Sequence, residues 1–131
     1  MRSTRVLGPV FLTAAAGLVM AAPQASAAVV HSVAVSPGLG NGFGTTCSYE
    51  IKAIVDASIA HRTIFRDNGW EIRGNGGPKE VNGDTVTQRW TPATPGEHVI
   101  TASVHVGTDE TVSTTIQVGE GTNLGSACVV R

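Results

Sequence analysis

Acidic residues and histidines are the side chains of this chain that could support catalysis or metal binding. The relevant residues are His31, His61, His98, His105, Asp67, Asp84, Asp109 and Glu110. Acid–base chemistry and calcium binding both need several such groups that converge at close spacing. Asp109 and Glu110 are the only adjacent acids, and neighbouring residues on a strand point to opposite faces of the sheet. We therefore expect no catalytic residue, no cofactor-binding residue and no metal site.

Sequence motifs of common active sites are also missing. The chain has no Gly-x-Ser-x-Gly nucleophile elbow and no His-Glu-x-x-His helix. The stretch GLGNGFG at residues 38–44 looks like a phosphate-binding loop, but the sequence after it is not helical, as such a loop requires. We interpret this stretch as a connector.

The two cysteines, Cys47 and Cys128, can form a single intramolecular pair. A disulfide between them would close a loop of about 80 residues and stabilise the fold by roughly 4 to 5 kcal/mol through the reduced entropy of the unfolded chain. The alternatives are a free reactive thiol, an intermolecular link and a two-cysteine metal site, although no tight Cys/His spacing supports the last. We predict the disulfide.

The first residues have the three regions of a secretory signal peptide. Arg2 and Arg5 precede an apolar run over residues 6–22, and the small-residue triplet Ala-Ser-Ala follows at 25–27. The run is short for a membrane span and is interrupted by glycine and proline. We expect residues 1–27 to be cleaved and the mature protein to be secreted and extracellular, where a disulfide can persist.

Residues 28–131 are long enough for one modest core and too short for two domains. Once Arg2 and Arg5 are removed, seven basic residues stand against ten acidic ones, which gives a net charge of about -3. The basic residues are scattered, so no basic surface for nucleic acid or for an anionic membrane is expected. We predict a single domain that binds neither, with an oligomeric state that the sequence leaves open.

Alternation of apolar and polar residues dominates the mature chain, and helical spacing is nearly absent. Seven short runs alternate in this way: 29–35, 47–57, 62–67, 70–73, 85–90, 96–106 and 111–118. In the first run, Val29, His31 and Val33 share the expected inward face. These runs predict an all-β fold, an antiparallel sandwich with Greek-key connections. Segments 36–46 and 74–84 are expected to be loops, and residues 56–62 could form a single helical turn.

Residues 62–73 predict a β-hairpin whose two-residue turn is Asn68-Gly69, since both residues tolerate the positive φ that a type I′ turn requires. With that loop length, Asp67 is opposite Trp70 and Arg66 is opposite Glu71. An opposite-charge pair then lies on one face of the hairpin and an apolar pair on the other, which agrees with a hairpin half-buried in a sheet.

The segments FRDNG at 65–69 and WTPATPGEHVITA at 90–102 resemble the bacterial immunoglobulin-like domains of secreted and cell-surface proteins. The resemblance covers residues 29–118 and implies an immunoglobulin-like sandwich with an adhesion, spacer or binding role. It also implies a structural role for His98, because immunoglobulin folds often have at this corner a tyrosine that bonds back to the backbone.

Two features depart from that family. The chain contains one copy and no internal repeat, which weakens a pure spacer role. An antibody-type disulfide would also have its second cysteine where this chain has Ile100. Here the pair Cys47 and Cys128 is instead predicted to pin the C-terminal tail, residues 121–131, beside the start of the second strand.

Trp70 with Arg66 and Arg73 is the contact patch that we predict, because exposed tryptophan and arginine are favoured at interfaces. The leading hypothesis is a secreted, non-enzymatic, immunoglobulin-like binding module that acts on a protein or glycan at the cell surface or outside the cell. The alternative is a structural or self-assembling extracellular protein that pairs through an exposed strand edge. A small secreted enzyme is the third reading, disfavoured because no titratable groups converge.

Overall fold

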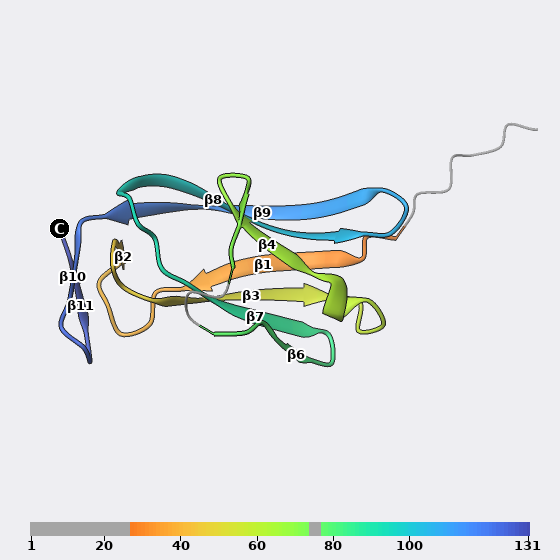
Figure 1. Cartoon of the computed structure of the whole chain (residues 1–131), viewed down its shortest axis with the longest axis horizontal. Helices are drawn as coiled ribbons and strands as arrows, with labels where there is room; N and C mark the ends of the chain where they lie inside the picture. Colours follow the sequence, from red (N-terminus) through yellow and green to blue (C-terminus); the bar gives the residue numbers. More distant parts are fainter. Residues whose placement is uncertain (1–26, 74–76) are drawn as a thin grey trace, which may run out of the picture.

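The computed structural model describes residues 27–73 and 77–131. The predicted signal peptide, apart from Ala27, lies outside these residues, as do positions 74–76 of the predicted loop. Within the described residues, no helix is long and apolar enough to cross a membrane. The molecule is elongated, with the start of the described chain and the C-terminus at opposite ends (Figure 1).

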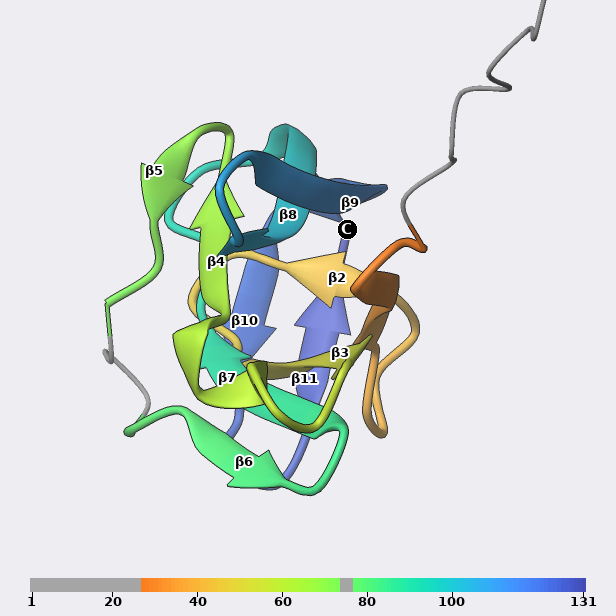
Figure 2. The same cartoon turned by 90° about the vertical axis from the view of Figure 1, so that its right-hand side faces the viewer.

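The fold is an all-β sandwich of two sheets, which confirms the predicted class. One sheet has the strand order β1-β3-β7-β6, and its strands are β1 (Val30–Ser36), β3 (Tyr49–Val55), β7 (Thr85–Trp90) and β6 (Glu80–Asn82). The other has the order β2-β9-β8-β4-β5, and its strands are β2 (Phe43–Gly44), β9 (Asp109–Gly119), β8 (Gly96–His105), β4 (Ile64–Asp67) and β5 (Trp70–Glu71). Figure 2 shows the two layers end-on, with β5 and β1 on opposite flanks.

This strand order has the connectivity of a Greek-key immunoglobulin sandwich. Strands β1, β3, β7 and β6 occupy the places of strands A, B, E and D, and strands β4, β8 and β9 those of C, F and G. Neighbouring strands are antiparallel except for the short pair β2–β9, which is parallel. The expected antiparallel sandwich is therefore correct apart from that one pair.

Among the described residues, all seven predicted strands are present, together with four short strands that the sequence does not predict. Strands β2 and β6 lie in segments that we expected to be loops, and the tail forms a separate two-stranded sheet of β10 (Gly121–Asn123) and β11 (Cys128–Val130). The expected helical turn is a short 3-10 helix, η1 (Ala60–Arg62). Two- and three-residue strands carry too little alternation to be distinguished from loops in a sequence.

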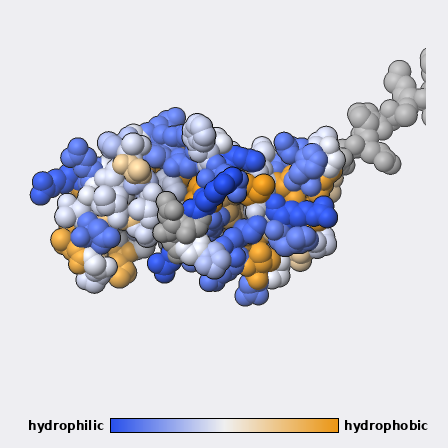
Figure 3. Space-filling view, in the orientation of Figure 1, coloured by the Kyte–Doolittle hydropathy of each residue, from blue (hydrophilic) through white to orange (hydrophobic). Residues whose placement is uncertain are grey.

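The core lies between the two sheets and is built from the alternating residues of β3, β7 and β8. Cys47, Tyr49, Ile51, Ala53 and Val55 are all buried, as their alternation predicts. From the facing sheet, the buried side chains include Phe65, Ile100, Ala102 and Val104. Seen from the side in Figure 3, apolar residues on the surface form scattered patches among hydrophilic ones.

His31 lies on the outside of the sandwich, so its predicted inward position is wrong. The pairing of β1 with β3 slips between Val30 and Ser32, where two steps along β1 match one step along β3. His31 is the additional, unpaired residue of this β-bulge on β1. As a result, the side chain of Val30 points into the core instead. The His31 ring contacts the Asp56 carboxylate in solvent at 2.8 Å.

The β4–β5 hairpin has the predicted register and turn. Asp67 pairs with Trp70 and Arg66 with Glu71, and the turn residues Asn68 and Gly69 have φ values of 46° and 84°. Both angles lie in the left-handed region, as a type I′ turn requires.

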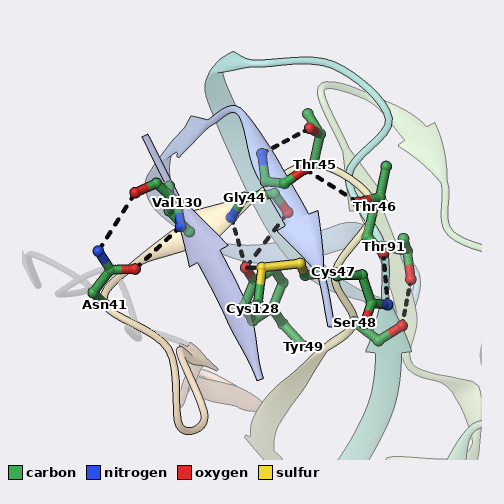
Figure 4. The surroundings of a disulfide bond; sticks show 12 residues. Asn41, Gly44, Thr45, Thr46, Cys47, Ser48, Tyr49, Thr91, Cys128 and Val130 are labelled. Atoms are coloured by element: carbon green, nitrogen blue, oxygen red, sulfur yellow. Dashed lines mark hydrogen bonds between the residues drawn. A yellow bond between two sulfur atoms is a disulfide. The ribbon is translucent and has the colours of Figure 1, made fainter. Parts of the chain in front are cut away.

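The disulfide Cys47–Cys128 is present and ties the tail to the start of β3, as predicted (Figure 4). The tail also docks through its backbone, since the Asn41 side chain bonds both the N–H and the carbonyl of Val130. A Cβ on Gly121 would overlap the backbone of Gly44 and Thr45, so glycine is required for this close approach. The tail is therefore packed as part of the domain at its far end (Figure 1).

Candidate functional site

A concavity of about 430 Å³ lies on the flank of the sandwich beside β5. It is bordered by the β4–β5 hairpin on one side and by the end of β7 with the following loop on the other. Residues that border it include Trp70, Arg73, Arg89, Asn68, Thr91 and Thr94, with Asp67, Trp90 and His98 beneath. Pockets of this kind, with a few polar groups around an aromatic surface, are the default binding-site hypothesis in a small domain.

Asp67 joins three strands beneath the concavity. Its carboxylate accepts a hydrogen bond from the indole Nε1 of Trp90 at 2.9 Å, and its oxygens lie 2.8 Å from Nδ1 of His98. Asp67 is on β4, Trp90 on β7 and His98 on β8, so this contact connects the two sheets. The Trp90 and His98 rings also pack edge to face, with centroids 5.5 Å apart.

His98 is a buried structural residue, which confirms its predicted inward position. Its Nε2 bonds back to the carbonyl of Thr94, four residues upstream, at 2.9 Å. This is the type of contact that a corner tyrosine makes in immunoglobulin folds. Both ring nitrogens thus have a hydrogen-bond partner within the protein.

The hairpin that carries Trp70 is held rigidly against β8. The Asn68 side chain accepts a hydrogen bond from Val99 N–H at 2.8 Å and donates one to the Glu97 carbonyl at 3.2 Å, and its backbone N–H donates to the Val99 carbonyl. On the far side of the turn, Gln88 donates to the carbonyl of Ile72 at 2.7 Å. A side chain on β5 is therefore presented from a fixed backbone.

Trp70 and Arg73 are both strongly exposed at the rim of the concavity. The indole of Trp70 is 82% exposed, and the Arg73 side chain makes a long ion pair with Glu71 at 3.5 Å. An aromatic ring of this size normally loses much of its surface on folding. A rigid hairpin that keeps it in solvent is the feature expected of a contact residue.

Arg66, the third residue of the predicted patch, lies elsewhere. Its guanidinium donates to the Ser103 hydroxyl on β8 at 2.5 Å. Asp67 and Trp70 share the hairpin face that turns toward the sandwich, and Arg66 alternates to the opposite face. The structure thus brings Trp70 and Arg73 together at the concavity and separates Arg66 from them.

Lys79 lies close to this hairpin and links β6 to the 3-10 helix. Its ammonium donates to the carbonyls of His61 and Thr63 at 2.9 and 2.6 Å. Burial there lowers the pKa of Lys79 below its usual 10.5, and the negative charge of Glu71 opposes this shift in part.

Comparisons with models of known protein families, with curated proteins and with solved structures find no significant match to this chain. The functional reading of the concavity therefore depends on its own chemistry.

Sequence reasoning missed Asp67 and Arg89 as residues of the site. The hairpin register could have placed Asp67 on the same face as Trp70, which is a usable signal. Arg89 precedes the buried Trp90 on the strand, so its sequence position predicts only an outward-facing side chain. Its place beside the concavity depends on how the loop after β7 passes the hairpin.

The two titratable groups beneath the concavity have structural roles. Asp67 and His98, the titratable groups beneath the concavity, are used in holding β4, β7 and β8 together. General acid–base catalysis needs such a group to be free to exchange a proton with the substrate. The exposed groups that remain are an indole, two guanidinium side chains, the Glu71 carboxylate beside Arg73, hydroxyls and an amide.

Proposed function

We propose that this chain is a secreted, non-enzymatic binding module that recognises its ligand through the concavity beside β5. The observation that carries the proposal is the 82% exposure of Trp70 on a hairpin with a fixed backbone. Burying such an indole against a partner supplies a large apolar contribution at low cost in side-chain entropy. The proposed ligand is a protein or glycan at the cell surface or outside the cell.

The resemblance of residues 65–69 and 90–102 to bacterial immunoglobulin-like domains supports the same proposal. The strand order is compatible with that family, whose members generally act as binding or adhesion modules. Secretion is proposed from the signal-peptide pattern of residues 1–27. The disulfide Cys47–Cys128 agrees with it, because disulfides persist in oxidising compartments.

The proposal is tested by measuring retention of the purified protein on the producer's own envelope fraction and on candidate host surfaces. Trp70→Ala should weaken retention by at least about tenfold, the effect of losing one strong interface anchor. Leu39→Ala is the matched control, because Leu39 is a 93% exposed apolar residue outside the concavity. Equal retention of the two variants and the unchanged protein would count against the site.

A second candidate function, self-assembly, is favoured by the edge of β9. This strand pairs with β8 along its whole length, but β2 covers its other edge only at Val118 and Gly119. In the described part of the chain, no strand pairs with that edge from Asp109 to Gln117, although β1 packs close to β9. The stretch has no lysine or proline, residues that commonly protect edges.

Self-assembly predicts dimers or larger species whose fraction rises with concentration. Thr115→Lys, which puts a charge on the exposed middle of that edge, should abolish them. Sedimentation of the purified protein over a wide concentration range tests this, and a monomer at the highest concentration would exclude it.

A further inference from the structure

The chemistry around the concavity narrows the class of ligand, if the proposed binding function holds. The rim combines the exposed indole of Trp70 with Arg73 and Arg89, and Thr91 and Asn68 add a hydroxyl and an amide. Aliphatic side chains are few there, namely Ile72 and Ala93. The ligand must therefore present a flat, weakly apolar surface for the indole and polar groups around it.

The positive charge that is open to a ligand is mainly that of Arg89. The carboxylate of Asp67 is taken by Trp90 and His98, and that of Glu71 is matched by Arg73. Among the described residues, Arg89 makes no ion pair, although it lies opposite Glu50 across the strand pair. Arginine binds carboxylates with two parallel hydrogen bonds, so a carboxylate on the ligand fits this rim.

We propose that the concavity binds an acidic sugar, a uronic acid unit within an oligosaccharide. One face of a pyranose ring carries C–H groups that can stack on the Trp70 indole, whose face is electron-rich. The ring carboxylate is then received by Arg89, and by Arg73 once it leaves its 3.5 Å contact with Glu71. The ring hydroxyls bond to Thr91, which also bonds Ser48, and to Asn68, which also bonds Val99 and Glu97. A volume of about 430 Å³ accommodates a short saccharide segment.

An acidic peptide is the competing occupant, and the concavity suits it less well. Peptide recognition usually relies on a desolvated apolar pocket for an anchor side chain, or on an exposed strand edge for backbone pairing. The side of β5 away from β4 offers only two residues, Trp70 and Glu71, for such pairing. Aliphatic lining is limited to Ile72 and Ala93, and the exposed aromatic residue at the rim is Trp70.

Titration of the purified protein with oligogalacturonate, oligomannuronate and oligoglucuronate, followed by amide NMR shifts, tests the proposal. At least one should bind, and its fully methyl-esterified form, which has the same rings without the charge, should bind at least about tenfold more weakly. Triglutamate, the acidic peptide control, should shift the same amides only weakly. Trp70→Ala should abolish binding, and Arg73→Gln and Arg89→Gln should each weaken it severalfold.

Two results overturn the acidic-sugar proposal: no uronate binds, or triglutamate or the methyl ester binds as well as the uronates. Leu39→Ala is again the control that should change nothing. The proposed binding function survives such a result if retention on surface fractions still depends on Trp70. It fails together with the sugar proposal if Trp70→Ala leaves both the retention and the amide shifts unchanged.

Discussion

Nδ1 of His98 lies 2.8 Å from both carboxylate oxygens of Asp67. The His98 side chain is 6% exposed and that of Asp67 20%, so the contact is shielded from water. One of the same oxygens accepts the indole N–H of Trp90. Asp67 therefore satisfies two buried donors from two other strands, and it does so directly beneath the concavity that Trp70 and Arg73 border.

Asp67→Ala should lower the free energy of unfolding by about 3 kcal/mol, because it leaves the Trp90 N–H and Nδ1 of His98 buried without a partner. Asp67→Asn retains one acceptor oxygen and should cost less. Urea unfolding measures both changes. Asp84→Ala is the control, since the Asp84 carboxylate is exposed and bonds only to Thr85, and it should stay within about 0.5 kcal/mol of the unchanged protein.

How much of this fold the sequence could predict depends on how local each feature is. The alternation from Cys47 to Val55 determines which side chains are buried, since a half-buried strand must put every second residue inside. The Asn68-Gly69 turn likewise fixes the hairpin register through its length alone. The bulge at His31 arises only when β1 pairs with β3, so no pattern within β1 reveals it.

The site was harder to predict because it is assembled from separate strands. Trp70 and Arg73 were identified as contact residues from their types and their place beside a turn. Nearness in sequence groups Arg66 with them. In the structure, alternation along the strand puts Arg66 on the other face of the hairpin, where it donates a hydrogen bond to Ser103. The concavity itself exists only where the β4–β5 hairpin and the end of β7 meet.

Thr63→Val should raise the free energy of unfolding by about 1 kcal/mol. Thr63 is 1% exposed, and its hydroxyl is a buried side-chain group without a hydrogen-bond partner among the described residues. Valine has nearly the same shape and removes the cost of burying that hydroxyl. Thermal unfolding measures the change. Thr63→Ser, which keeps the hydroxyl and loses the methyl group, should destabilise; a loss of stability in Thr63→Val would show that the hydroxyl is in fact bonded.

The lowered pKa of Lys79 predicts a pH dependence of stability. Between its folded pKa and 10.5, the unfolded chain holds the Lys79 proton and the folded chain does not, so stability rises with pH in that window. Below the window, the cost of burying the charged ammonium is present in full. Lys79→Arg keeps a charged donor that does not titrate there and should lose this rise. Unfolding free energies of both proteins from pH 8 to about 10.5 test it, and superimposable profiles would contradict the assignment.

Removal of the disulfide should destabilise the domain and loosen the tail first. With Cys47→Ser and Cys128→Ser together, we expect a loss of about 4 to 5 kcal/mol, since the bridge closes a long loop. Amide exchange of β10 and β11 should accelerate far more than that of β3 or β8, because hydrogen bonds such as those of the Asn41 side chain then hold the tail without a covalent link. Asn41→Ala with the disulfide intact is the matched control and should cost about 1 kcal/mol. Uniform acceleration across all strands would mean instead that the tail and the sandwich unfold only as one unit.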